Sequence, residues 1–246
     1  MNDMINTIQL GDCYELIKKI PDKSIDLVYI DIPYEINYSG GGCLDKNVKN
    51  NKIIMNKKTD TLLKGIDYSI LDDLIRIMKH IYIWCSKNQI YDLMKYFVDK
   101  GCKYNILVWC KDNPVPFGAA QFLSDVEYCL VFFEPGIEIT ESGYENKRKW
   151  YISHINQSDK KLFNHPTIKP LEFVKQHIIN STKENDIVLD CFCGSGTTCV
   201  AAKELGRRYI GMEIDPEYHK IAVDRLNGIT ANGQTSIFTD FDNLGE

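Results

Sequence analysis

Apolar and polar positions along the chain form short blocks that fit either the two-residue period of strands or the 3.6-residue period of helices. These blocks predict strands over 6–10, 25–30, 80–85, 106–110, 127–133, 187–189 and 208–212. They predict helices over 14–20, 71–78, 90–100, 171–181 and 198–205. Strands that alternate with helices are typical of an α/β domain whose sheet is largely parallel.

The stretch from Ile187 to Pro216 has the most informative pattern. Its first strand ends at Asp190, and Gly194 and Gly196 follow before the next helix begins. Glycines let the backbone pass close beneath a ligand, because they carry no Cβ. The following strand ends at Glu213, where a carboxylate can accept hydrogen bonds from both hydroxyls of a ribose. The stretch therefore predicts a cofactor that contains adenosine.

The residues around the turn narrow the choice of cofactor. A triphosphate-binding loop has Lys and then Ser or Thr after its last glycine, whereas Thr197 and Thr198 follow here. A dinucleotide-binding loop has a third glycine where this chain has Cys199. Asp190 at the strand end suits a ligand with an amino group, which S-adenosylmethionine (SAM) carries. The alternative is a tight turn that binds no ligand.

A second motif, Asp31-Ile32-Pro33-Tyr34, directly follows the strand at 25–30. The carboxyl ends of parallel strands are where open α/β sheets place their chemistry. An aromatic ring can stack on a base turned out of a duplex, while a carboxylate and a neighbouring carbonyl accept the hydrogens of its exocyclic amine. These acceptors make the nitrogen lone pair available and stabilise the positive charge that develops.

Together the motifs resemble those of the amino-group DNA methyltransferases. D-C-F-C-G-S-G-T-T with G-M-E-I-D-P-E-Y resembles their cofactor motifs, D-I-P-Y resembles D-P-P-Y, and L-G-D-C and H-P-T-I-K-P have counterparts as well. D-I-P-Y precedes the glycine turn, which is the order of the β class. The resemblance implies a Rossmann-like SAM-dependent methyltransferase fold with a mostly parallel seven-stranded sheet and helices on both faces.

The resemblance also implies the site residues. The catalytic set would be Asp31, Ile32, Pro33 and Tyr34. The cofactor-binding set would be Asp12, Cys13, Asp31, Thr167, Lys169, Asp190, Phe192, Gly194, Ser195, Gly196, Thr197 and Glu213. Asp12 would accept from the adenine amine, although it could equally cap a helix. Lys169 would offer its charge to the cofactor carboxylate. No metal is expected.

The leading Asp31 favours adenine in this family, so the expected reaction is methylation of adenine N6 in DNA by base flipping. Methylation of cytosine N4 is the nearest alternative, and an RNA substrate is a more distant one. The chain departs from the family at Ile32 and Cys191, where proline is usual. A third interpretation follows from Ile32, namely a module that binds cofactor and DNA but has impaired turnover.

Length and composition limit the number of domains and the cellular compartment. With 246 residues and 44% apolar content, the chain fits one catalytic domain, 1–246. Nine cysteines without a C-x-x-C pair, together with a first segment unlike a signal peptide, indicate a cytoplasmic protein. The family resemblance implies that the cell is a bacterium or a phage-infected host. No apolar run is long enough to cross a membrane.

The net charge of −5 does not by itself indicate a protein that binds nucleic acid, but the basic residues are clustered. One cluster lies in residues 35–68, which we expect to be a flexible loop that contacts double-stranded DNA. The other lies in 136–164, the expected target-recognition insertion. Either cluster could instead be ordinary solvated surface. Whether the chain forms a homodimer or acts with a restriction-system partner is a question that the sequence leaves open.

Overall fold

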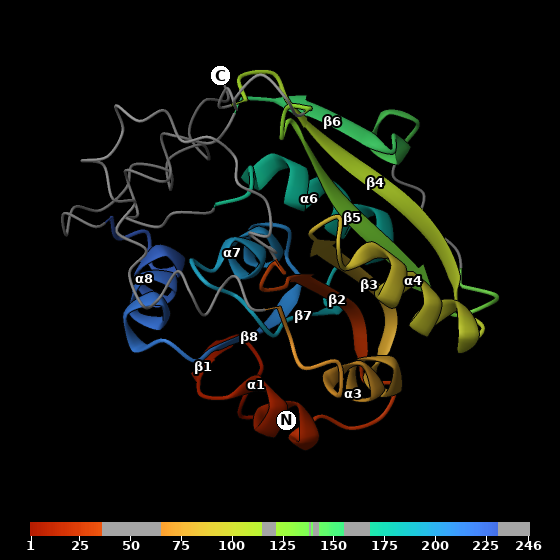
Figure 1. The fold of residues 1–246 in the computed structure, drawn as a ribbon. Coiled ribbons are helices and arrows are strands. Elements are labelled where there is room, and N and C mark those ends of the chain that lie inside the picture. The colour runs from red at the N-terminus through yellow and green to blue at the C-terminus, as the bar shows by residue number, and fades with distance from the viewer. Residues whose placement is uncertain (36–64, 115–121, 138, 140–142, 155–167, 231–246) are drawn as a thin grey trace, which may run out of the picture.

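The computed structural model describes residues 1–35, 65–114, 122–137, 139, 143–154 and 168–230. Its elements in chain order are β1 (Thr7–Leu10), α1 (Cys13–Leu16), η1 (Ile17–Lys19), β2 (Ile25–Asp31), α3 (Ile70–Ile77), β3 (Met78–Cys85), α4 (Ile90–Asp99), β4 (Lys103–Lys111), β5 (Val126–Phe133), η3 (Glu145–Lys147), β6 (Trp150–Ser153), α6 (Leu171–Ser181), β7 (Ile187–Asp190), α7 (Thr197–Glu204), β8 (Arg208–Glu213) and α8 (Pro216–Leu226) (Figure 1).

The described strands form one mixed sheet of eight strands in the order β1-β8-β7-β2-β3-β5-β4-β6. The five neighbouring strands β1, β8, β7, β2 and β3 run parallel to one another. β5 runs antiparallel to both β3 and β4, whereas β6 runs parallel to β4. The Rossmann-like α/β class expected from the sequence is confirmed.

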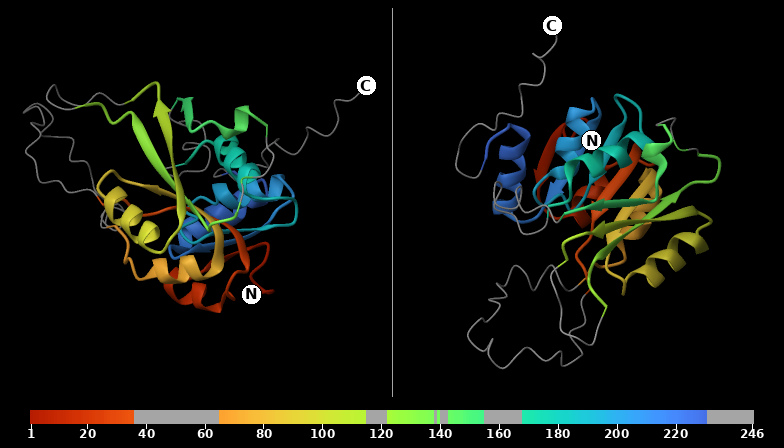
Figure 2. Two further views of the ribbon diagram at one scale, coloured as in Figure 1. Left: turned by 90° about the vertical axis from the view of Figure 1, so that its right-hand side faces the viewer. Right: turned by 90° about the horizontal axis from the view of Figure 1, so that it is seen from above.

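Apolar side chains on the two faces of the sheet form two separate cores, because neighbouring residues of a strand point to opposite faces. On one face, Val28 and Ile30 of β2 pack with buried residues of α3 and α4. On the other face, Leu27 and Tyr29 pack with residues of α6, α7 and α8. Figure 2 shows the sheet between these helical layers.

Between the adjacent strands β2 and β7, the direction in which the chain adds further strands to the sheet reverses. From β2 the chain continues to β3 on one side, and from β7 it continues to β8 on the other. A crevice forms at such a switch point, outside the carboxyl ends of the strands. Asp31, Asp190 and Glu213 are the last residues of the three adjacent strands β2, β7 and β8. Residues that are distant in the sequence therefore meet at one edge of the sheet.

Two features differ from the sequence expectations. The described sheet has eight strands rather than the expected seven, and the additional strand is β6. Its four residues, Trp-Tyr-Ile-Ser, lie within a polar segment, and their alternation of exposed and half-buried positions is too short to detect. Helix α8 was also missed, although Asp215 caps it through the Glu217 amide (2.8 Å) and Pro216 opens it.

Several expectations fall on residues outside the described ranges. These are most of the 35–68 loop with its basic cluster, much of the 136–164 insertion, and Thr167. Among the described residues, no helix combines the length and the apolar composition that crossing a membrane requires.

Candidate active site

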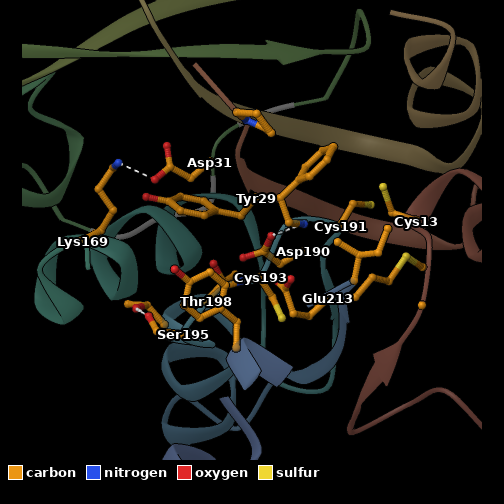
Figure 3. A pocket seen from close by; sticks show the side chains of 18 of the residues that line it. Cys13, Tyr29, Asp31, Lys169, Asp190, Cys191, Cys193, Ser195, Thr198 and Glu213 are labelled. Carbon is orange, nitrogen blue, oxygen red and sulfur yellow. Dashed lines mark hydrogen bonds and ion pairs between the residues drawn. The ribbon is translucent and has the colours of Figure 1, made fainter. Parts of the chain in front are cut away.

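A cavity opens at the carboxyl ends of the central strands, at the switch point (Figure 3). Eleven of the predicted site residues line it: Asp12, Cys13, Asp31, Pro33, Lys169, Asp190, Phe192, Gly194, Ser195, Thr197 and Glu213. Its apolar wall includes Val174 and Met212. Ile32, Tyr34 and Gly196 are not among the lining residues, and Thr167 lies outside the described ranges.

The glycine turn is held by close packing against α8. Gly194 and Gly196 have positive φ angles of 49° and 76°, in the left-handed region that favours glycine. A Cβ on Gly196 would lie 3.0 Å from the Cβ of Ala222, so only glycine fits without movement of the helix. Behind the turn, the buried Arg225 donates from Nη1 to Thr197 Oγ1 (2.7 Å) and Ser195 Oγ (3.3 Å).

Glu213 closes the cavity next to this turn. Its Oε2 accepts from the Gly194 amide (2.9 Å) and its Oε1 accepts from the Asp215 amide (2.8 Å). These bonds fix the orientation of the carboxylate, while each oxygen retains acceptor capacity for a ligand. Burial raises the pKa of Glu213, and the two amides oppose that rise.

Asp190 is the most enclosed carboxyl of the cavity, with 4% of its surface exposed. Its Oδ1 accepts from the Phe192 amide (3.0 Å). Burial raises the pKa of Asp190 to about 7, and the hydrogen bonds that it accepts limit the rise. A cationic group placed beside this carboxyl would therefore favour its ionised form.

Asp12 and Cys13 form another part of the cavity wall, at the start of α1. Asp12 caps this helix, because its Oδ1 accepts from the Tyr14 amide (2.9 Å). The capping role expected as an alternative is therefore present, and it leaves the second carboxylate oxygen for other contacts.

Asp31 lies across the cavity from these groups and belongs to a chain of alternating charges. Its Oδ2 accepts from Lys169 Nζ (2.6 Å), and the same ammonium lies 3.0 Å from Glu127 Oε2. Glu127 Oε1 lies 2.7 Å from Lys111 Nζ. The other oxygen of Asp31, Oδ1, is buried and accepts no hydrogen bond from the described residues. This oxygen is therefore an acceptor whose hydrogen-bonding capacity the described residues do not use.

The neighbouring charges decide the protonation states of Glu127 and Lys169. Burial alone would raise the pKa of Glu127, but Lys169 and Lys111 outweigh it and lower that pKa to about 2. Burial alone would lower the pKa of Lys169, but Asp31 and Glu127 outweigh it and raise that pKa. Lys169 is therefore a permanent cation, engaged by two carboxylates of the protein rather than standing free for a ligand.

The loop after Asp31 is held from behind by the β3–α4 connection. The Ile32 amide donates to the Trp84 carbonyl (3.2 Å), and the Ile32 side chain is buried. Gln89, also fully buried, donates from Nε2 to the Pro33 carbonyl (3.0 Å). A proline at position 32 could not make the first of these bonds, because it has no N–H.

Sequence reasoning missed Glu127, Gln89 and Arg225. Each holds a predicted residue in place, and each lies on an element that is distant from it in the sequence. A charged Glu127 inside an otherwise apolar strand, and an arginine on a helix flank, were the only signals that the sequence offered.

The pattern of the DNA methylase family that comprises N6 and N4 methyltransferases matches residues 25–224, which is most of the chain. The chain belongs to this family of N6/N4 DNA methylases. Two relatives are similar over nearly its whole length. The type II methyltransferase M2.LlaDCHI of Lactococcus lactis subsp. cremoris is 30% identical, over 88% of this chain and 87% of that protein. The type II methyltransferase M.HinfI of Haemophilus influenzae is 32% identical, over 94% of this chain and 71% of that protein.

Solved structures agree with the fold of this methylase. M1.HpyAVI in complex with SAM matches with a TM-score of 0.65 at 24% identity, over 89% of this chain and 98% of that chain. The cytosine-N4-specific PvuII DNA methyltransferase matches with a TM-score of 0.67 at 18% identity, over 89% and 85%. At these identities the likeness concerns the fold alone.

SAM is the cofactor of this methylase, and the cavity fits it. Glu213 offers carboxylate oxygens for a ribose, and Asp190 offers a buried carboxyl for an ammonium group. Phe192, Val174 and Met212 provide apolar surface. The expected role of Lys169 toward the cofactor carboxylate stays a prediction, since its ammonium contacts Asp31 and Glu127.

Proposed function

We propose that this DNA methylase transfers a methyl group from SAM to the exocyclic N6 of adenine in double-stranded DNA, after the base has turned out of the duplex. The observation that carries the proposal is the buried acceptor Oδ1 of Asp31, which has no hydrogen-bond partner among the described residues and lies at the end of β2 beside β7. Asp31 lines the same cavity as Asp190 and Glu213, to which we assign the cofactor.

The residues of the chain would act on the amine of the base. SAM supplies an electrophilic methyl group on a sulfonium. Asp31 Oδ1 would accept one hydrogen of the amine, and the Ile32 carbonyl would accept the other. The nitrogen lone pair, otherwise delocalised into the ring, would then be directed toward the methyl carbon, so that the new C–N bond forms as the C–S bond of the sulfonium breaks and S-adenosylhomocysteine leaves. The carboxylate would stabilise the charge that develops on nitrogen and would accept the proton that the methylated amine releases, passing it on to solvent. The Tyr34 ring would stack on the extruded base, so that the reacting atoms are aligned.

Asp31→Ala tests this assignment. The variant should lose transfer of labelled methyl to DNA, while its affinity for SAM should be close to that of the wild type, because Asp31 is assigned to the base. Scintillation counting of DNA measures the first property and calorimetry the second. Undiminished transfer would remove Asp31 from the mechanism.

The target base is assigned to adenine because the motif begins with Asp31 rather than with Ser, the residue more usual for cytosine in the resembling family. Hydrolysis of methylated DNA to nucleosides, followed by mass spectrometry, separates N6-methyladenine from N4-methylcytosine. Appearance of the second product would overturn the assignment. Label on RNA in a competition assay would change the substrate class.

The structure offers an argument against impaired turnover. Ile32 replaces the usual proline, but its amide donates to the Trp84 carbonyl, a bond that completes the last pair of the β2–β3 ladder, Asp31 with Trp84. Backbone pairing then supplies the rigidity that proline would have provided. A chain with lost turnover would retain SAM and DNA and yield no labelled product.

For contact with DNA we propose both expected segments, the loop at 35–68 and the insertion at 136–164. Support comes from the described part of the second segment, where Arg148 lies over the Trp150 ring of β6, 5.0 Å from its centroid.

The relatives described as type II methyltransferases support a role beside a restriction endonuclease. Single-molecule sequencing of DNA from expressing cells would identify the methylated site, and light scattering would show whether the protein is a dimer.

A further inference from the structure

Glu127 joins side chains from three separate parts of the chain. One of its carboxylate oxygens, Oε1, pairs with Lys111 of β4. The other, Oε2, accepts from the Tyr34 hydroxyl (3.1 Å) and lies 3.0 Å from the Lys169 ammonium. Glu127 does not line the cavity, and both of its carboxylate oxygens are engaged by side chains of the protein itself. Its influence on the reaction would have to pass through Tyr34 and Lys169.

A contribution to stability is a weak explanation for this arrangement. The Glu127 side chain is 18% exposed and that of Lys169 is 10% exposed, so both charges have lost most of their hydration. Buried ion pairs often contribute little net stability, because the desolvation cost offsets the attraction. The same charges have a clear geometric effect on the groups that surround Asp31.

The position of Glu127 is fixed by the sheet. Glu127 lies opposite Trp109 in the antiparallel pairing of β5 with β4, and the Lys111 amide donates to the Asp125 carbonyl (2.7 Å). A group carried on a paired strand is held more accurately than one carried on a loop. Tyr34, by contrast, lies in the loop after β2 and needs an external partner to hold its ring.

We propose that Glu127 is a positioning residue of the methyl-transfer site, which anchors the Tyr34 hydroxyl and draws Lys169 to one side of Asp31. The inference rests on the proposed function. Lys169 lies between the two carboxylates and occupies Oδ2 of Asp31, whereas Oδ1 has no partner among the described residues and is the oxygen we assign to the amine. The bond from Tyr34 fixes the plane of the ring on which the base would stack. The strand β5 thereby sets the geometry of a loop that is 93 residues away in the sequence.

The Glu127→Gln variant tests this role, because it keeps the shape of the side chain and removes its charge. We expect kcat to fall roughly 10- to 100-fold, because a single neutral amide oxygen replaces the charged carboxylate that held both the Tyr34 hydroxyl and Lys169. The Kd for SAM should stay close to that of the wild type, whereas the Tm should fall, because the half-buried Lys111 and the buried Lys169 lose a counter-charge. A purely structural role would instead lower SAM affinity along with kcat, even at temperatures well below the Tm.

Glu134→Gln provides the matched control. Glu134 directly follows β5 and forms an ion pair with Lys23, at the end of the strand away from the cavity. Its replacement removes a more exposed ionic contact at the end of the same strand without touching Tyr34 or Lys169, so kcat should be unchanged.

Tyr34→Phe removes the hydrogen bond to Glu127 from its other end, together with the longer bond that Lys169 donates to the Tyr34 hydroxyl (3.4 Å), and leaves every ion pair intact. Its kcat should fall, and the double variant with Glu127→Gln should lose less than the product of the two single losses, because both changes break one shared contact. Losses that multiply would overturn the proposal, as would a wild-type kcat in Glu127→Gln or in Tyr34→Phe. Absence of methyl transfer by the wild-type protein would instead refute the proposed function, which keeps the two failures distinct.

Discussion

The glycine turn beneath the cofactor cavity permits a quantitative test of close packing. Gly196 has a φ of 76°, and an added Cβ would lie 3.0 Å from the Cβ of Ala222 and 3.2 Å from its Cα. The second contact is with backbone, so α8 would have to move. Gly101, which follows α4, has a similar φ of 83°, but no atom lies within 4 Å of its added Cβ. The two glycines therefore share the backbone strain and differ in the contact.

Gly101→Ala should cost about 1–2 kcal/mol of folding free energy, the strain of a non-glycine residue in the left-handed region. Gly196→Ala should cost the same strain plus about 1–3 kcal/mol for overpacking against α8, or roughly 2–5 kcal/mol in all. Movement of α8 should also displace the turn from Glu213, whose Oε2 accepts from the Gly194 amide. SAM affinity should therefore fall for Gly196→Ala only.

Urea unfolding measures the two free energies, and calorimetry measures the Kd for SAM. The difference between the variants isolates the contact, because the backbone strain cancels. If Gly196→Ala is no less stable than Gly101→Ala and binds SAM as the wild type does, the close approach of α8 to the turn is not a constraint and the reasoning fails.

Three further predictions concern single residues. Glu213→Ala should weaken SAM binding by about 1–3 kcal/mol in calorimetry, because ribose hydroxyls would lose their acceptor; an unchanged Kd would refute the ribose assignment. SAM affinity should rise as the pH increases through about 7, because burial raises the pKa of Asp190 to about 7 and an ammonium group requires the ionised form. The raised pKa also means that the contribution of Asp190 to the stability of the apo protein is full below the ordinary aspartate pKa and is lost as the pH rises through about 7. Calorimetry in buffers of different ionisation enthalpy should show that SAM binding releases a proton near pH 7. The Asp190→Asn substitution should abolish this proton release. Ile32→Pro should lower the Tm although it restores the family motif, because it removes the bond from the Ile32 amide to Trp84 and a buried side chain; a higher Tm would show that this bond contributes nothing.

The sequence by itself determined the elements and the local motifs. Strand and helix periods located most elements to within a few residues, because burial of one face imposes its period on the sequence. Asp190, the glycines and Glu213 could be singled out because a tight turn needs glycine and because strand ends carry the chemistry of parallel sheets. Asp31 and Tyr34 were singled out in the same way. These signals are local, since each depends only on a residue and its near neighbours in the chain.

Only the tertiary structure decided which of these groups meet. The switch point between β2 and β7 brings Asp31 beside Asp190 across 159 positions of the chain. The antiparallel pairing of β5 carries Glu127 to Tyr34 and Lys169. Lys169 was expected at the cofactor, yet its ammonium contacts two carboxylates whose approach no spacing in the sequence encodes. Strand order and register depend on packing of the whole domain, so contacts across strands are decided only when the sheet is assembled.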